Sequence, residues 1–203
     1  MLASRSDGAM TDANEILPLA IAVHEVGHAV AHLLINAAVP KPETRVRELT
    51  LDPSDGNLGL TRIHLLRKTL PHYHAVRCLG GYAAELALDF GRDWPAAEAA
   101  RLAREAVEGR HDNVVDFSAA LAALCRLPGA NLEGEFFRCW LAAVAVARAD
   151  WQALLAVARE LVAARAMDGA KFEASWHAAH GADDAALLEK LRRLGERSRK
   201  LMA

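Results

Sequence analysis

The residues of this chain best suited to chemistry stand together in HEVGH, where His24, Glu25 and His28 interrupt an apolar stretch. The run LPLAIAVHEVGHAVAHLLIN, residues 17–36, is long and apolar enough to form a helix. On a helix, residues four apart lie one turn above each other, so His24 and His28 can bind one metal ion from the same face. Two imidazoles, a third protein ligand and an open position are typical of a catalytic zinc site. The spacing therefore predicts Zn²⁺ at this helix.

Glu25 gives the motif its expected activity. It lies beside the face of the two histidines and can reach a water molecule on the ion without being a ligand. Zinc lowers the pKa of such a water to about 7, and the carboxylate accepts its proton as the water attacks a peptide carbonyl. The alternative is a helix with two hydrogen-bonded core histidines and no metal. His32 repeats the four-residue spacing, but it lies about 12 Å along the helix from His24 and is predicted to be a packed side chain.

The elements that must position this motif are mainly helical. The first helix is expected over residues 17–36, with Pro18 near its start and Asn36 near its end. VRELTL and LGLTRI alternate like strands on either side of the turn DPSDGN and predict a β-hairpin or small sheet. Further helices are predicted at residues 72–91, 95–109 and 112–127, as a broken pair within 135–169, and at 183–202. The expected fold class is therefore α+β, mainly α with a small β-hairpin or sheet.

The composition narrows the class of protein. Of the 203 residues, 53% are hydrophobic and 25% are charged, which predicts a folded globular chain. The formal net charge of −2 argues against a nucleic-acid partner. The three cysteines form no CxxC pair, which favours a reducing, cytoplasmic location. No signal peptide is expected, and no membrane span, since the apolar run carries ionisable groups that are costly in a bilayer.

Several segments resemble one family in the same order along the chain. HEVGHAVAH is similar to the zinc motif of FtsH-type proteases, in which a zinc peptidase domain follows an AAA+ ATPase module. LTLDPSDGNLGLTRI resembles the strand, turn and strand that follow that motif. LGGYAAELALDFG and DFSAALAA resemble two later helical segments, and ARADWQALLAVARELVAARAMDG resembles the last helical hairpin. The resemblance covers roughly residues 17–176 and implies an FtsH-like peptidase domain with a zinc-binding HExxH helix and a C-terminal helical hairpin.

The resemblance also implies roles for individual residues. His24 and His28 would be zinc ligands, Glu25 the catalytic base, and Asp116 the third ligand. The implied division of the chain is a flexible N-terminal tail, a zinc peptidase domain and a basic amphipathic C-terminal helix, at residues 1–11, 12–178 and 179–203.

Two other acidic residues are candidates for the third ligand. The family reaches its aspartate soon after Phe-Gly, whereas residues 95–109 intervene here, so Asp112 competes with Asp116. The other role expected for Asp112 is a helix N-cap. Glu85 is a candidate because other zinc peptidases take a glutamate from a downstream helix. If Glu85 is not a ligand, it can orient a histidine from outside the metal centre.

The chain departs from the family in lacking the ATPase. No GxxxxGK[ST] loop occurs, so no ATP binding is expected. The expected function is an ATP-independent zinc endopeptidase that cuts unfolded or extended polypeptides. The alternatives are a regulatory protease dedicated to one partner and a non-catalytic, zinc-stabilised adaptor protein. A homo-oligomer is compatible with the family. The basic face at residues 190–200 is either a docking surface or a solvated face.

Overall fold

The computed structural model describes residues 13–40, 44–52, 58–65, 69–90 and 114–203, and isolated positions between 98 and 110. Side chains in the first helix are described from Leu17 onward. The predicted tail at 1–11, most of the predicted helix at 95–109, and Asp112 lie outside the described residues.

Helices dominate the described part of the chain, as the sequence predicts. Seven helices and three strands are described, which confirms the α+β class. The helices are α1 (Ala13–Ala38), α2 (Pro71–Phe90), α4 (Val114–Leu124), α5 (Leu132–Ala149), α6 (Trp151–Ala164), α7 (Gly169–Ala179) and α8 (Ala185–Met202). The strands are β1 (Thr44–Thr50), β2 (Leu60–Leu65) and β3 (Ala166–Asp168).

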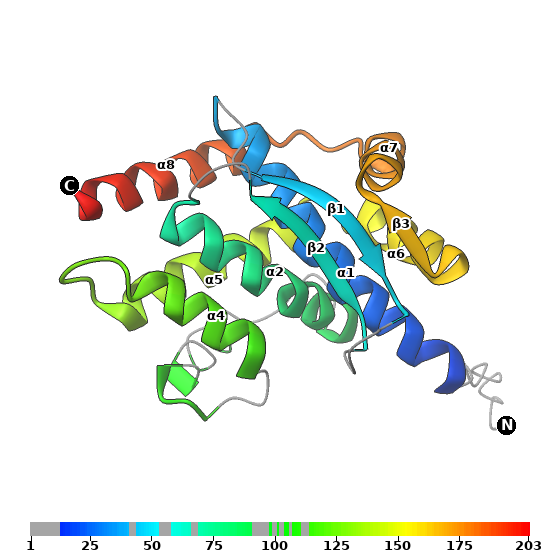
Figure 1. Cartoon of the computed structure of the whole chain (residues 1–203), viewed down its shortest axis with the longest axis horizontal. Helices are drawn as coiled ribbons and strands as arrows, with labels where there is room; N and C mark the ends of the chain where they lie inside the picture. The colour runs from blue at the N-terminus through cyan, green and yellow to red at the C-terminus, as the bar shows by residue number, and fades with distance from the viewer. Residues whose placement is uncertain are drawn as a thin grey trace, which may run out of the picture.

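The sheet lies over the first helix. Its strand order is β2-β1-β3, and both pairings are antiparallel. Figure 1 shows β1 and β2 crossing α1, with α2, α4 and α5 on one side and α6 and α7 on the other. The predicted hairpin is confirmed as β1 and β2. β3 was not predicted from the sequence, because three residues carry no alternation and only tertiary pairing with β1 makes AMD a strand.

One helix begins clearly earlier than predicted, and another was not predicted. α1 begins at Ala13, not near residue 17, so Pro18 lies inside the helix. Helix α7 was not predicted at all; Asp168 caps it by accepting a hydrogen bond from the Lys171 amide at 2.8 Å. The broken helical pair is confirmed as α5 and α6, which meet at Asp150.

Helices α1 and α2 touch backbone to backbone at two glycines. A Cβ added to Gly27 would lie 2.5 Å from the carbonyl oxygen of Gly80, and one added to Gly80 would lie 2.7 Å from that of Gly27. Neither position has room for a side chain. This contact fixes the distance between the helix of the HEVGH motif and α2.

The first helix also has the length and composition of a membrane span. Within the described residues, Leu17–Ala38 passes that test, and α5 with α6 passes only if the two, bent by 78°, are taken as one span. Most of the α1 window is buried by other elements of the protein. The core helix of a folded domain has the same property.

A buried polar network joins α2, α5 and α8. Nε2 of His72 donates to Glu135 at 2.9 Å, and the Ser198 hydroxyl lies 2.9 Å from Nδ1 of His72. Nε of Arg197 donates to the same carboxylate at 2.8 Å. Hydrogen bonds from Arg197 outweigh burial and, with His72, lower the pKa of Glu135 to about 2. The network satisfies polar groups that would be costly to bury alone.

Replacing Glu135 should destabilise the fold in a pH-dependent way. Glu135 has a lowered folded pKa, so its contribution is present above its unfolded pKa of about 4.5 and is lost as pH falls toward 2. We expect Glu135→Gln to lower the free energy of unfolding by about 1–3 kcal/mol at pH 7. The difference between the two proteins should shrink below pH 4.5, as measured by urea unfolding. Glu133→Gln, an exposed change on the same helix, is the control; an equal loss there would contradict the assignment.

Candidate metal centre

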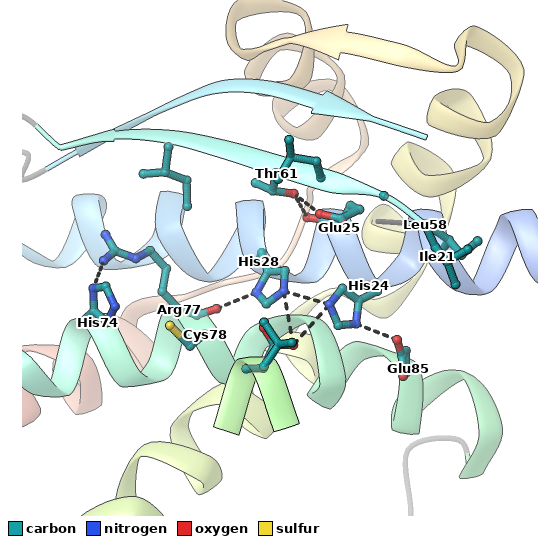
Figure 2. Close-up of a pocket in the computed structure, with 15 residues that line it drawn as sticks. Ile21, His24, Glu25, His28, Leu58, Thr61, His74, Arg77, Cys78 and Glu85 are labelled. Carbon is teal, nitrogen blue, oxygen red and sulfur yellow. Dashed lines mark hydrogen bonds and ion pairs between the residues drawn. The ribbon is translucent and has the colours of Figure 1, made fainter. Parts of the chain in front are cut away.

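Two histidines of α1 present their ring nitrogens to one point. His24 and His28 lie one helical turn apart, with ring centroids 4.6 Å apart in an edge-to-face arrangement. Their Nε2 atoms are 2.9 Å apart. Figure 2 shows both rings pointing from α1 toward α2. The four-residue spacing thus brings the two imidazoles together, as the sequence predicts.

A third donor reaches this pair from α4. Oδ2 of Asp116 lies 3.2 Å from Nε2 of His24 and 3.6 Å from Nε2 of His28. The three ligand atoms all lie within 4.8 Å of one another, and no other such group occurs among the described residues. Glu85 is not a member of the cluster, and Asp112 lies outside the described part of the chain.

The remaining ring nitrogens bond to acceptors on α2. Nδ1 of His24 lies 2.6 Å from Oε1 of Glu85, and Nδ1 of His28 lies 2.8 Å from the Arg77 carbonyl oxygen. Because a carboxylate and a carbonyl accept, each Nδ1 carries the proton. The Gly81 amide lies 3.3 Å from Nδ1 of His28, but an amide inside a helix donates to the carbonyl four residues earlier. With Nδ1 as the donor, the neutral form of each imidazole presents an unprotonated Nε2 to the cluster.

Three acceptor atoms facing one another favour a positive charge between them. Burial lowers the pKa of His24, but hydrogen bonds and charges from Asp116 and Glu85 outweigh burial and raise that pKa to about 10. Burial acts to raise the pKa of Asp116, but His24 and His28 hold it well below its usual range. The cluster stabilises a cation at this point, whether a proton or a metal ion.

The donor set fits Zn²⁺. Zinc binds imidazole nitrogen and carboxylate oxygen at about 2.0–2.2 Å, so two ligand atoms of a tetrahedral site are about 3.3 Å apart. The edges of the observed triangle measure 2.9, 3.2 and 3.6 Å. Metal-bound histidines also donate their other N–H to a carboxylate or carbonyl, as His24 and His28 do.

Glu25 borders the same space without joining the ligand atoms. Its Oε2 accepts a hydrogen bond from the Thr61 hydroxyl at 2.7 Å, and the side chain lies between β2 and the histidine pair (Figure 2). Gly59 permits this approach, since a Cβ there would lie 2.8 Å from Oε1 of Glu25. The carboxylate is 6% exposed and held beside the cluster, the placement that a base requires.

These residues line a cleft of about 580 Å³ between α1, β2, α2 and α4. Its rim carries apolar side chains that are unusually exposed, Leu58 at 65% and Val115 at 80%. Ile21 and Ile63 add apolar surface inside it. The cleft can therefore accept an extended chain with apolar side chains.

Sequence reasoning missed part of the α2 wall. Nη2 of Arg77 donates to Nδ1 of His74 at 2.8 Å, and both residues line the cleft. Burial, followed by the charges of Arg77 and Arg126, lowers the pKa of His74 to about 4, so this histidine is neutral at pH 7. The signal was the helical spacing of residues 74, 77, 78, 81 and 85, which places them on one face of α2.

Gly81 lies on that face directly against the two histidines. A Cβ at this position would lie 2.5 Å from Nε2 of His28 and 2.7 Å from Nε2 of His24. A side chain would therefore overlap the atoms that form the cluster. The GlyGly pair in LGGYAAE thus serves two purposes, with Gly80 packing on α1 and Gly81 leaving room for the imidazoles.

One open cleft thus holds the nitrogen and oxygen donors of His24, His28 and Asp116 and, beside them, the carboxylate of Glu25. No protein-family model and no curated protein matches the chain. The chemistry of the cleft is therefore inferred from its own residues.

Proposed function

We propose that this chain is a zinc-dependent endopeptidase that acts without ATP, built as an FtsH-like peptidase domain. The observation that carries the proposal is the convergence of His24, His28 and Asp116 within one cleft that also holds Glu25. A structural zinc site usually has four protein ligands. Three protein ligands in an open cleft leave a position for water or substrate, which favours catalysis.

Each residue has a defined task in this proposal. His24, His28 and Asp116 hold the ion, and Glu85 and the Arg77 carbonyl orient the two imidazoles. Bound zinc would supply Lewis-acid polarisation of the scissile carbonyl and a water molecule of lowered pKa.

Glu25 takes the proton from the attacking water and returns it to the leaving amine. The Thr61 hydroxyl donates to Oε2 of Glu25 and thereby holds the Glu25 carboxylate in the cleft.

The substrate we propose is an extended or unfolded polypeptide segment. β2 is an edge strand of the described sheet and pairs with β1 on one side only. Leu58, Gly59 and Thr61, in β2 or just before it, line the cleft. An edge strand can pair with an extended backbone by β-augmentation, and the apolar rim can contact the side chains. A segment already paired within a folded protein would not be available for this contact.

Removal of the third ligand tests this function. We expect the zinc-loaded protein to hold one Zn²⁺ per chain and to cleave unfolded, fluorescently labelled casein without ATP. Asp116→Asn replaces a charged donor by a neutral amide and should lower zinc affinity by about a hundredfold or more, with a parallel loss of hydrolysis. Zinc competition with a chromophoric chelator measures the affinity.

The control is Asp89→Asn, an exposed change on α2 that should leave both properties unaltered. Failure of the wild-type protein to bind zinc would overturn the proposal. Stoichiometric zinc without hydrolysis of casein would instead support the non-catalytic adaptor or a protease dedicated to one partner.

A further inference from the structure

A second hollow, of about 550 Å³, lies between α5 and α8. It shares no lining residue with the cleft of the candidate metal centre. Helix α8 carries six basic and two acidic residues, although the whole chain has a formal charge of −2. The hollow is referred to below as the α5–α8 groove.

Positive charge surrounds the α5–α8 groove. Four of its lining residues are basic and one is acidic; these are Arg138, Lys190, Arg193, Arg197 and Glu189. Glu189 pairs with Arg193 at 3.0 Å, and the Glu135 carboxylate, 2% exposed, pairs with Arg138 and Arg197 from within the fold. Two carboxylates thus face four cations, and the groove keeps an excess of positive charge.

The floor of the groove is apolar. Leu141 of α5 and Leu194 of α8 lie there, and Lys190 is held across it by donating to the Leu141 carbonyl oxygen at 3.1 Å. The lining residues of α8 run from Ala186 to Arg197, about 16 Å along the helix. Such a length matches a helical segment of about eleven residues.

We propose that the α5–α8 groove docks an acidic amphipathic segment of a partner polypeptide. Glutamate or aspartate side chains would pair with the cationic rim, and one or two leucine-like side chains would contact the floor. This site goes beyond the proposed peptidase function and does not depend on it, because the two surfaces have no residue in common.

Two other anionic partners fit this surface less well. A nucleic-acid backbone would gain nothing from Leu141 and Leu194 and would meet the carboxylate of Glu189. Insertion into an anionic membrane needs apolar side chains that protrude. Here Leu194 is buried, and Met202 is the only large apolar residue of α8 that is highly exposed.

Binding of a designed peptide to the full chain tests the proposal. The probe is a fluorescein-labelled helical peptide of about twelve residues, with glutamates on one face and leucines at i, i+3 and i+7. We expect saturable binding by fluorescence anisotropy that weakens with added salt. Arg138→Gln with Arg193→Gln should raise the Kd about tenfold or more. Both arginine side chains are more than half exposed, at 55% and 75%, so the fold should survive.

Matched controls separate the groove from general electrostatic attraction. Arg159→Gln removes one positive charge from the exposed face of α6 and should leave the Kd unchanged, whereas either Arg138→Gln or Arg193→Gln alone should raise it. A polyglutamate peptide of equal length, which lacks leucines, should bind more weakly than the probe. EDTA should have no effect, and a loss of binding with EDTA would assign the probe to the metal cleft instead. Equal affinity of wild type and double variant would overturn the proposal, as would tighter binding of a single-stranded oligonucleotide or of phosphatidylserine vesicles.

Discussion

Glu25→Gln is expected to abolish peptide hydrolysis while the protein still binds zinc. A positioned general base contributes about 10²–10⁴ to the rate, and glutamine keeps the size of the side chain without its basicity. The amide oxygen can still accept the Thr61 hydroxyl that Oε2 accepts at 2.7 Å, so the fold should be unaffected. Hydrolysis of labelled casein and zinc content per chain, measured on the same samples, report the two properties separately.

The control for this result is Glu173→Gln, which removes an exposed carboxylate from α7, away from the cleft. It should retain full hydrolysis. If Glu25→Gln kept more than a tenth of the wild-type rate, Glu25 would not be the base. If it lost zinc as well, its role would lie in holding the metal centre, and the proposed division of tasks would be wrong.

Gly81→Ala should destroy zinc binding even though alanine is the better helix former. In an ordinary helical position this change stabilises a protein by about 0.5–1 kcal/mol. Here the added methyl would lie 2.5 Å from Nε2 of His28 and 2.7 Å from Nε2 of His24. The rings would have to turn away and give up their bonds to Glu85 and the Arg77 carbonyl. We expect zinc affinity to fall about a hundredfold or more.

Gly134→Ala provides the matched comparison. Gly134 lies in the first turn of α5, where an added Cβ would meet its nearest neighbours, atoms of Asn131, no closer than 3.5 Å. This variant should keep its zinc and unfold at a slightly higher temperature. Circular dichroism establishes that both variants remain helical. A folded Gly81→Ala protein with wild-type zinc affinity would show that the rings have more room than the structure gives them.

The sequence predicts the half of the candidate metal centre that is local in the chain. His24, Glu25 and His28 follow from helical spacing alone, since their relative positions depend on one element. The proposed third ligand could not be derived in this way. Asp116 is 88 residues beyond His28, and its position depends on the packing of α4 against α2. Asp116 was predicted only because the family resemblance implied it, and Asp112 and Glu85 were the other candidates.

The same distinction applies to the fold. The helices α1, α2, α5, α6 and α8 and the β1–β2 hairpin follow from local sequence patterns and are confirmed. Most of the helix predicted at 95–109 lies outside the described residues. β3 and the placement of Thr61 against Glu25 depend on contacts between distant segments, which periodicity does not encode. Arg77 and His74 lay on a recognisable face of α2, but nothing in the sequence states which face of a buried helix borders a cleft.

Under the proposed zinc function, the backbone contact between α1 and α2 would have a consequence for ion selectivity. At Gly27 and Gly80 the backbones of α1 and α2 are in direct contact, with no side chain between them. Helix α4, which carries Asp116, packs against α2. Moving Asp116 away from the two histidines by shifting α4 together with α2 would separate the helices that touch at these glycines. Calcium, which prefers oxygen donors at 2.3–2.6 Å, would have to pay for that separation. Copper(II), which favours tetragonal arrangements, would meet three donors converging from one side. Discrimination among metals would then be determined as much by two glycines outside the ligand set as by the donor atoms themselves.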